Sequence, residues 1–181
     1  LTNYKGQKME LINFLFATIN SNLWLTCLLI VILLFFSAFF SGSETALTGA
    51  SRAKLMKMME KGSNGAEKAL SLRDDNEKLI GALLLGNNLV NILAAALATS
   101  LLTTYFQDTG VLVATLIMTV LILIFSEVLP KTYAITNPEL AASKVSKVVT
   151  ILVIVLYPFV AAIRTVVRLL LLIFGINIDP N

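Results

Sequence analysis

The sequence predicts an all-α integral membrane protein built on three long apolar segments. Of its 181 residues, 57% are hydrophobic and only 14% are charged, and the mean hydropathy is +0.84. A soluble domain carries about 25% charged residues. The composition therefore excludes a disordered chain, a coiled coil, a collagen-like chain and an ordinary cytosolic enzyme. The chain has no histidine, and its single cysteine, Cys27, cannot form an internal disulfide.

Three uncharged or nearly uncharged segments are candidate membrane spans. They cover residues 23–40, 79–102 and 111–130. About 20 apolar residues are needed to cross a hydrocarbon core of about 30 Å, so the first two segments qualify by themselves. The third reaches this length only when Ser126, Glu127 and their neighbours lie near the membrane boundary.

Lysine and arginine are concentrated on one side of these spans. Seven stand between the first and second spans and three follow soon after the third: Arg52, Lys54, Lys57, Lys61, Lys68, Arg73, Lys78, Lys131, Lys144 and Lys147. By the positive-inside rule, the segments 41–78 and 131 onward are cytoplasmic and residues 1–22 are extracytoplasmic, although Lys5 and Lys8 act against this orientation. The expected location is the cytoplasmic (inner) membrane. Because these charges record orientation, no nucleic-acid partner is expected.

The segment 44–78 is predicted to form a juxtamembrane helical hairpin after the first span. Leu55, Met58 and Met59 stand at roughly helical spacing among the lysines. A Gly-Ser-Asn-Gly run at 62–65 interrupts this pattern before it resumes. Both a solvated connector and a pair of helices lying in the membrane interface are consistent with the pattern.

A fourth apolar segment, 148–174, has two interpretations. It is long enough to span, but Pro158 interrupts it, and Arg164 and Arg168 lie one turn apart near its end. As a fourth span, it would place the arginines at the outer surface. As a kinked helix in the cytoplasmic interface, it would let them reach anionic lipid head groups. Hydropathy favours the first interpretation, and the charges favour the second.

Each of the three spans carries a cluster of polar residues, in a setting where polar side chains are costly and usually functional. The clusters are Ser41-Gly42-Ser43-Glu44-Thr45-Ala46, Gly86-Asn87-Asn88-Leu89-Val90-Asn91 and Ser126-Glu127-Val128-Leu129-Pro130-Lys131. They offer hydroxyl, amide and carboxylate oxygens, which hard cations such as Mg²⁺ and Ca²⁺ prefer, whereas soft metals prefer sulfur or imidazole. The clusters therefore favour a hard-cation site that draws on all three spans.

Local geometry supports such a site. Asn87 and Asn91 lie four residues apart and so share one helix face. Pro130 has no N–H to offer to the carbonyl of Ser126, and the glycines of the first two clusters allow close backbone approach or a local break. Taken singly, each residue also has a structural explanation, because serine and asparagine often join membrane helices and Glu127 could pair with a nearby lysine.

At these three clusters the sequence resembles the membrane domain of the CorC/CorB (CNNM-like) family of magnesium transporters, over roughly residues 23–175. The resemblance implies a homodimer with three spans per subunit, a kinked interfacial belt helix at 138–174 and a cytoplasmic C-terminus. It implies Mg²⁺ export, coupled to Na⁺, from an inward-open cavity between the spans. The site residues that it implies are Ser43, Asn91 and Glu127, with Asn87, Ser41, Ser126 and the backbone of Gly86 as weaker candidates.

The resemblance also implies domains outside this sequence. Family members continue into cytosolic CBS domains that bind ATP, so residues 176–181 are expected to begin a linker to them. Besides the ions, membrane lipids are the expected partners. No enzymatic activity is expected, because the clusters contain no evident catalytic set. An alternative from another functional class stays open, namely a membrane-embedded Mg²⁺ sensor or scaffold that moves no ions.

Overall fold

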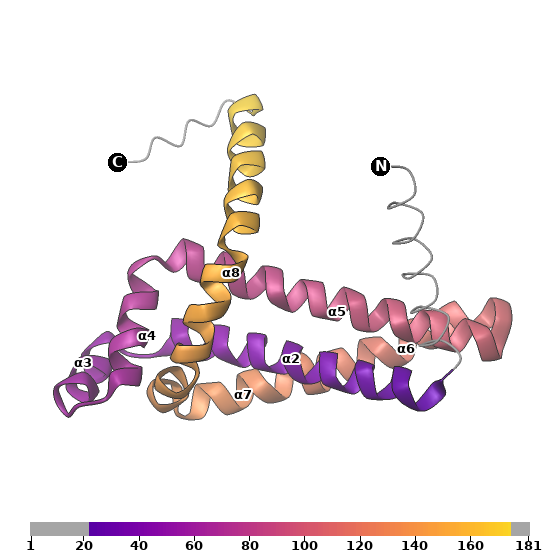
Figure 1. Cartoon of the computed structure of the whole chain (residues 1–181), viewed down its shortest axis with the longest axis horizontal. Helices are drawn as coiled ribbons and strands as arrows, with labels where there is room; N and C mark the ends of the chain where they lie inside the picture. The colour runs from indigo at the N-terminus through magenta and orange to yellow at the C-terminus, as the bar shows by residue number, and fades with distance from the viewer. Residues whose placement is uncertain (1–21, 175–181) are drawn as a thin grey trace, which may run out of the picture. The chain divides into compact units, whose positions relative to one another are not determined.

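The computed structural model describes residues 22–174, and these residues form helices and short turns with no β-strand among them (Figure 1). The predicted all-α fold is confirmed. The chain divides into two compact units. Unit 1 comprises the residues up to Ala38 with Leu89–Leu129, and unit 2 comprises Phe39–Asn88 with the residues from Pro130 onward. The predicted linker 176–181, and the predicted extracytoplasmic segment 1–22 up to residue 21, lie outside the described residues.

The helices follow one another with few connecting residues. In chain order, the described helices are α2 (Leu23–Gly49), α3 (Arg52–Glu60), α4 (Asn64–Asp74), α5 (Asn76–Phe106), the 3₁₀ turn η1 (Gln107–Thr109), α6 (Gly110–Leu121), the π-helical segment η2 (Ile122–Val128), α7 (Leu129–Thr136) and α8 (Pro138–Ile173). The first helix is longer than the predicted span 23–40, because it continues through its polar cluster to Gly49.

Three helical stretches in the described residues are long and apolar enough to cross a membrane, namely Leu23–Gly49, Asn76–Thr136 and Pro138–Ile173. The middle stretch contains both the second and the third predicted spans, because the chain reverses within it at η1. Helix α8 meets the same criterion of length and composition, so its place in the membrane interface stays a prediction.

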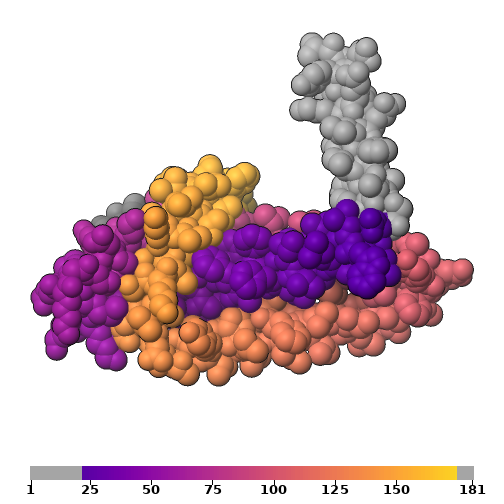
Figure 2. All heavy atoms as spheres, turned by 60° about the horizontal axis from the view of Figure 1, so that its bottom comes forward, coloured from indigo at the N-terminus to yellow at the C-terminus, as the bar shows by residue number. Residues whose placement is uncertain are grey.

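The surface of the spanning helices is apolar. Along α2, large side chains such as Val31 and Phe35 are exposed, and Figure 2 shows this helix from the side. Exposed apolar surface of this extent marks contact with a membrane or a partner. Together with the three apolar stretches, it identifies an integral membrane protein.

Unit 1 is built around a tight reversal between α5 and α6. A Cβ atom added at Gly110 would lie 2.5 Å from the Cα of Thr103, so only glycine lets α6 begin against the end of α5. Behind this reversal, a core of buried apolar side chains, two of them alanine, joins α2, α5 and α6: Ile30, Ala94, Leu97, Ala98 and Met118. Alanine at such positions lets membrane helices approach closely.

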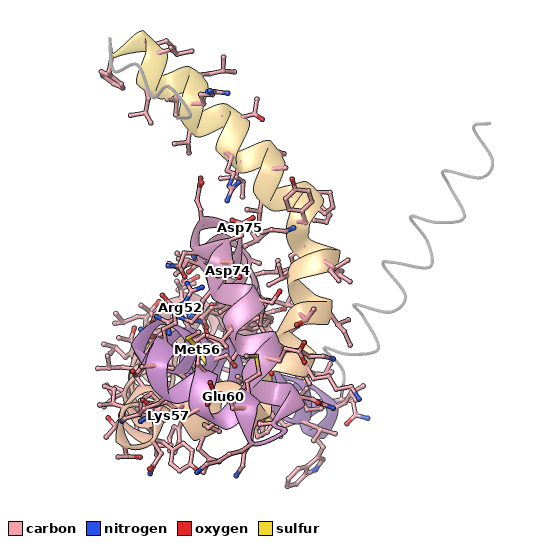
Figure 3. All side chains as sticks on the ribbon, turned by 90° about the vertical axis from the view of Figure 1, so that its left-hand side faces the viewer. Arg52, Met56, Lys57, Glu60, Asp74 and Asp75 are labelled. Carbon is pink, nitrogen blue, oxygen red and sulfur yellow. The ribbon has the colours of Figure 1, made fainter. Side chains whose placement is uncertain are left out.

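Unit 2 contains the predicted hairpin, formed by α3 and α4. Gly62 has a φ of 89°, in the left-handed region, and so ends α3. Ser63 then caps α4, since its Oγ accepts a hydrogen bond from the N–H of Ala66 at 3.3 Å. An ion pair between Arg52 and Asp74 (3.3 Å) joins the two helices on their exposed side, as Figure 3 shows.

The hairpin packs against the first half of α8 through small polar residues. The Oγ of Ser146 donates to the carbonyl of Gly65 at 2.8 Å, and the hydroxyls of Ser63 and Ser143 lie 3.1 Å apart. The carboxylate of Glu139 accepts a hydrogen bond from the N–H of Ser51 at 3.2 Å and also pairs with a lysine of α3. Further along, α8 contains Pro158 without being broken, and its ribbon changes direction part-way (Figure 1).

The contact of α4 with α8 leaves no space for a side chain at Gly65, because an added Cβ would overlap the backbone oxygen of Ser143. We expect Gly65→Ala to lower the free energy of unfolding by about 1–3 kcal/mol, as overpacking does. Gly49→Ala is the matched control, because its nearest neighbour, Pro138, would lie 3.9 Å away. Thermal unfolding in detergent measures both, and equal midpoints for the two variants would contradict this account of the packing.

Candidate cation site

The first polar cluster lies inside helix α2 and is buried. Ser41 and Ser43 are no more than 1% exposed. Nearby, the Oγ1 of Thr45 donates to the carbonyl of Ser41 at 3.2 Å, so this hydroxyl is satisfied within the helix. The helix therefore carries its serines into the interior of the protein without a local break.

Ser43 differs from the other serines of the site, because its Oγ has no hydrogen-bond partner among the described residues. Leaving a buried hydroxyl unsatisfied costs about 1–3 kcal/mol. Such an atom in a folded protein calls for an explanation, and a bound ion or water is the usual one. The geometry thus singles out Ser43 as a candidate ligand.

The second cluster approaches α2 through a glycine. A Cβ added at Gly86 would overlap the ring of Phe40, so α5 and α2 make their close contact at this pair. Helix α5 is unbroken here, which shows that Gly86 serves close approach and not a break. The next residue, Asn87, is buried as well, at 7% exposure.

The third cluster meets α2 two residues further along, at Gly42. A Cβ added at Gly42 would lie 3.4 Å from the Cβ of Pro130 and 3.5 Å from its carbonyl oxygen. The segment 40–42 of α2 is therefore the common neighbour of residues from the other two clusters. Unit 2 contains four of the seven predicted residues: Ser41, Ser43, Gly86 and Asn87.

The other three predicted residues belong to unit 1. Ser126 is fully buried, and its Oγ donates to the carbonyl of Leu34 in α2 at 3.3 Å. Asn91 and Glu127 are half-buried. Helix α5 is continuous through Asn91, one turn beyond Asn87, as the spacing of the two asparagines requires.

The backbone around Glu127 is a feature that sequence analysis missed. Residues Ile122–Val128 form a π-helix, and the N–H of Leu129 donates to the carbonyl of Ile124, five residues back. The sequence signal for this π-helix is Pro130. It has no N–H to donate to the carbonyl four residues earlier, so the backbone hydrogen bonds shift from a four-residue to a five-residue spacing. Short π segments inside α-helices are rare and frequently occur at functional sites.

The chemistry of the three clusters is that of an oxygen-ligand site. Among the described residues, no group of three or more histidine, cysteine, aspartate or glutamate side chains could hold a metal ion. The three clusters themselves offer hydroxyl and amide oxygens together with the carboxylate of Glu127. Such a set suits a hard cation that keeps part of its hydration shell.

Comparison with known proteins agrees with the motifs. The UPF0053 inner membrane protein YfjD of Escherichia coli is 40% identical over 143 residues, which are 79% of this chain and 33% of that protein. A UPF0053 protein of Haemophilus influenzae is 37% identical over 152 residues, or 84% of this chain and 36% of the relative. A polyamine export protein of the same organism is 27% identical over 165 residues. The chain thus spans about a third of the length of these curated relatives.

The family itself follows from a match that covers most of the chain. Residues 28–181 fit the family model described as the Cyclin M transmembrane N-terminal domain (CNNM). The resemblance carried by the three polar clusters is confirmed, and this integral membrane protein belongs to the CNNM family.

Proposed function

We propose that this membrane domain exports Mg²⁺, with Na⁺ as the coupling ion, through an inward-open site lined by the three polar clusters. Ser43, Asn91 and Glu127 are the proposed principal ligands. The supporting ligands are Ser41, Asn87, Ser126 and the backbone of Gly86. The observation that carries the proposal is the buried, unsatisfied hydroxyl of Ser43 within an oxygen-rich cluster.

The donor set favours Mg²⁺ over softer metals. Mg²⁺ takes oxygen ligands in octahedral array and usually keeps several waters, so it needs few protein carboxylates. Glu127 supplies one negative charge, and neutral hydroxyl and amide oxygens supply further contacts. A cation site formed by helices that carry irregular backbone near the middle of the bundle is also common in secondary transporters, and η2 is such a segment.

Polyamines are a second candidate cargo, because one relative is named a polyamine export protein. A polyamine is an elongated cation whose ammonium groups are separated by carbon chains. It would need acceptors spread along the pathway, whereas Mg²⁺ gathers its ligands around one point. Amide and hydroxyl oxygens can accept from ammonium groups, so flux measurements have to decide between the two cargoes.

A homodimer and the cytosolic CBS domains of a longer chain complete the proposal. In the proposed cycle, Mg²⁺ enters from the cytoplasmic side and exchanges water for the oxygens of the three clusters. A rearrangement of the spans then opens the site outward, and Na⁺ occupies the same oxygens on the return.

Flux into proteoliposomes tests the proposed transport. Glu127→Gln keeps the size of the side chain but removes its charge, so we expect Mg²⁺ flux to fall at least about tenfold, the factor that 1.4 kcal/mol of cation stabilisation represents. Glu60→Gln, at an exposed position in α3, is the control and should leave flux unchanged. Na⁺ gradients of opposite sign should change the Mg²⁺ flux in opposite directions.

Three outcomes of this assay would contradict the proposal. Saturable Mg²⁺ binding without flux would indicate a sensor or scaffold. Flux of spermidine without flux of Mg²⁺ would indicate a polyamine exporter. Equal Mg²⁺ flux in Glu127→Gln and in the unmodified protein would remove Glu127 from the site.

Ser43→Ala separates the roles of this residue in stability and in binding. Removing an unsatisfied buried hydroxyl should raise the stability of the Mg²⁺-free protein by about 1 kcal/mol. The same variant should gain less stability from added Mg²⁺, because the stabilisation by a ligand at a given concentration increases with the logarithm of its affinity for the folded state. Thermal unfolding with and without Mg²⁺ measures both effects. Ser71→Ala, at an exposed position of α4, is the control and should show neither effect. A loss of stability in Ser43→Ala would contradict the assignment of Ser43 as a buried, unsatisfied ligand.

Pro130→Ala tests the role of the π-helical segment. The variant restores the missing N–H, so we expect η2 to return toward α-helical bonding and the protein to gain up to about 3 kcal/mol of stability. The carboxylate of Glu127 would then leave its position, and Mg²⁺ binding measured by calorimetry should weaken. Pro138→Ala is the control, because Pro138 occupies the first turn of α8, where proline costs little. Unchanged binding in Pro130→Ala would show that the π segment has no part in the site.

A further inference from the structure

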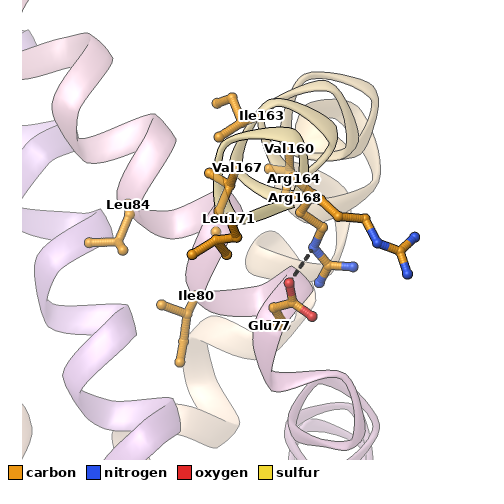
Figure 4. Close-up of a pocket in the computed structure, with 10 residues that line it drawn as sticks. Glu77, Ile80, Leu84, Val160, Ile163, Arg164, Val167, Arg168 and Leu171 are labelled. Atoms are coloured by element: carbon orange, nitrogen blue, oxygen red, sulfur yellow. Dashed lines mark ion pairs between the residues drawn. The ribbon is translucent and has the colours of Figure 1, made fainter. Parts of the chain in front are cut away.

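A groove between the start of α5 and the second half of α8 lies within unit 2, and the proposed cation site does not use it. It has a volume of about 630 Å³, within the range of ligand pockets. The two helices make close contact at one point, where a Cβ added at Gly81 would lie 2.9 Å from the Cγ1 of Val160. Beside this contact the helices diverge, and the groove opens between them (Figure 4).

The walls of the groove are apolar. Ile80 and Leu84 of α5 face Ile163, Val167 and Leu171 of α8 (Figure 4). Leu84, Ile163 and Val167 are more than 40% exposed, so the described residues leave part of this apolar surface uncovered. Hydrocarbon is the simplest cover for a groove of this kind in an integral membrane protein.

Charged groups gather at one end of the groove. The Nε of Arg164 lies 3.1 Å from a carboxylate oxygen of Glu77, and its Nη2 lies 3.6 Å from the carboxylate of Asp75.

Arg168, one turn beyond Arg164 on α8, lines the groove and is exposed. Among the described residues, no carboxylate forms an ion pair with Arg168. Arg164 is paired with carboxylates, whereas the positive charge of Arg168 has no counter-ion among the described residues.

We propose that this groove binds one anionic phospholipid, with its phosphate at Arg168 and an acyl chain along Ile80, Leu84 and Val167. The charge of the head group matches the uncompensated positive charge, and the chain covers the exposed apolar wall. The ion pairs with Asp75 and Glu77 position the guanidinium of Arg164 at the charged end of the groove. Arg164 therefore offers further N–H donors to the phosphate.

The groove combines an apolar wall with an unpaired positive charge, and the proposed occupant has to match both. Inorganic phosphate would satisfy Arg168 and leave the apolar wall uncovered. A zwitterionic phospholipid would cover the wall but would not balance the charge. An apolar helix from a second copy of the chain would bury Arg168 without a counter-ion, which is costly. An anionic phospholipid satisfies both parts at once.

Native mass spectrometry of the full chain in detergent tests this site. Phosphatidylglycerol and phosphatidylethanolamine with identical acyl chains are added in turn, and retained lipid is counted. The unmodified protein should retain phosphatidylglycerol in preference. Arg168→Gln should lower this retention about fivefold, the contribution of one cationic side chain beside an anionic lipid. Leu84→Trp fills the apolar part and should lower the retention of both lipids.

Matched variants control for effects outside the groove. Arg52→Gln removes an exposed arginine of α3, and Leu116→Trp adds a large side chain at an exposed position of α6, so neither should change lipid retention. Added inorganic phosphate should not displace the lipid. Thermal unfolding verifies that each variant is folded.

Several results would overturn the proposal. These are equal retention of the two lipids by the unmodified protein, unchanged phosphatidylglycerol retention in Arg168→Gln, or full displacement by inorganic phosphate. A fourth is a shift between monomer and dimer in Leu84→Trp without a change in bound lipid, which would mean that a second copy of the chain occupies the groove.

Discussion

The close contacts that helix α2 makes at residues 40–42 are the constraint on which the candidate site depends. Gly86 lets α5 reach the ring of Phe40, and Gly42 lies against Pro130 of α7. Because other helices approach α2 so closely just before Ser43, the hydroxyl of Ser43 is buried. It is buried although no described residue forms a hydrogen bond with it. Burial without a partner is costly, and a cation or water that restores the lost contacts recovers that cost. Close helix packing and the unsatisfied burial of Ser43 are in this way two consequences of the same pair of glycine-dependent contacts.

The same physical rule explains the backbone near Glu127. In a membrane, backbone N–H and C=O groups must find partners within the protein, because lipid offers none. Pro130 removes one backbone N–H donor. The helix continues through this position as the π-helical segment Ile122–Val128 and does not break. Widening the helix changes the angular position of each side chain relative to an α-helix of the same sequence. The helical turn that carries Glu127 is thus widened next to a proline three residues away.

The sequence predicted the elements of this fold better than their ends. Uncharged length and lysine distribution identified the apolar helices and the hairpin, because hydrophobic matching to the membrane depends on composition. The predicted first span covers residues 23–40, whereas helix α2 continues beyond it to Gly49. There the hydroxyls of Thr45 and Thr48 donate to backbone carbonyls one turn earlier, which keeps polar residues compatible with a helix. Hydropathy does not record such bonds, nor does it record how a helix responds to Pro130. The site residues were recognisable by type, whereas the unsatisfied state of Ser43 depends on packing.

Helix α8 is held by two different kinds of contact on the two sides of Pro158. Its first half packs through buried small and branched side chains, among them Ala142, Ser146, Val149 and Val153. After the proline, Val160 is the one buried residue among the described part of the helix, and the remaining attachments are ion pairs of Arg164 with exposed carboxylates. Exposed ion pairs contribute at most about 1 kcal/mol each, whereas a buried aliphatic side chain contributes about 1.5–3 kcal/mol. The second half of α8 therefore separates from α5 at lower cost than the first half separates from the hairpin. A lipid that covers the groove between them adds apolar contact where the protein supplies least, and so strengthens the weaker of the two attachments.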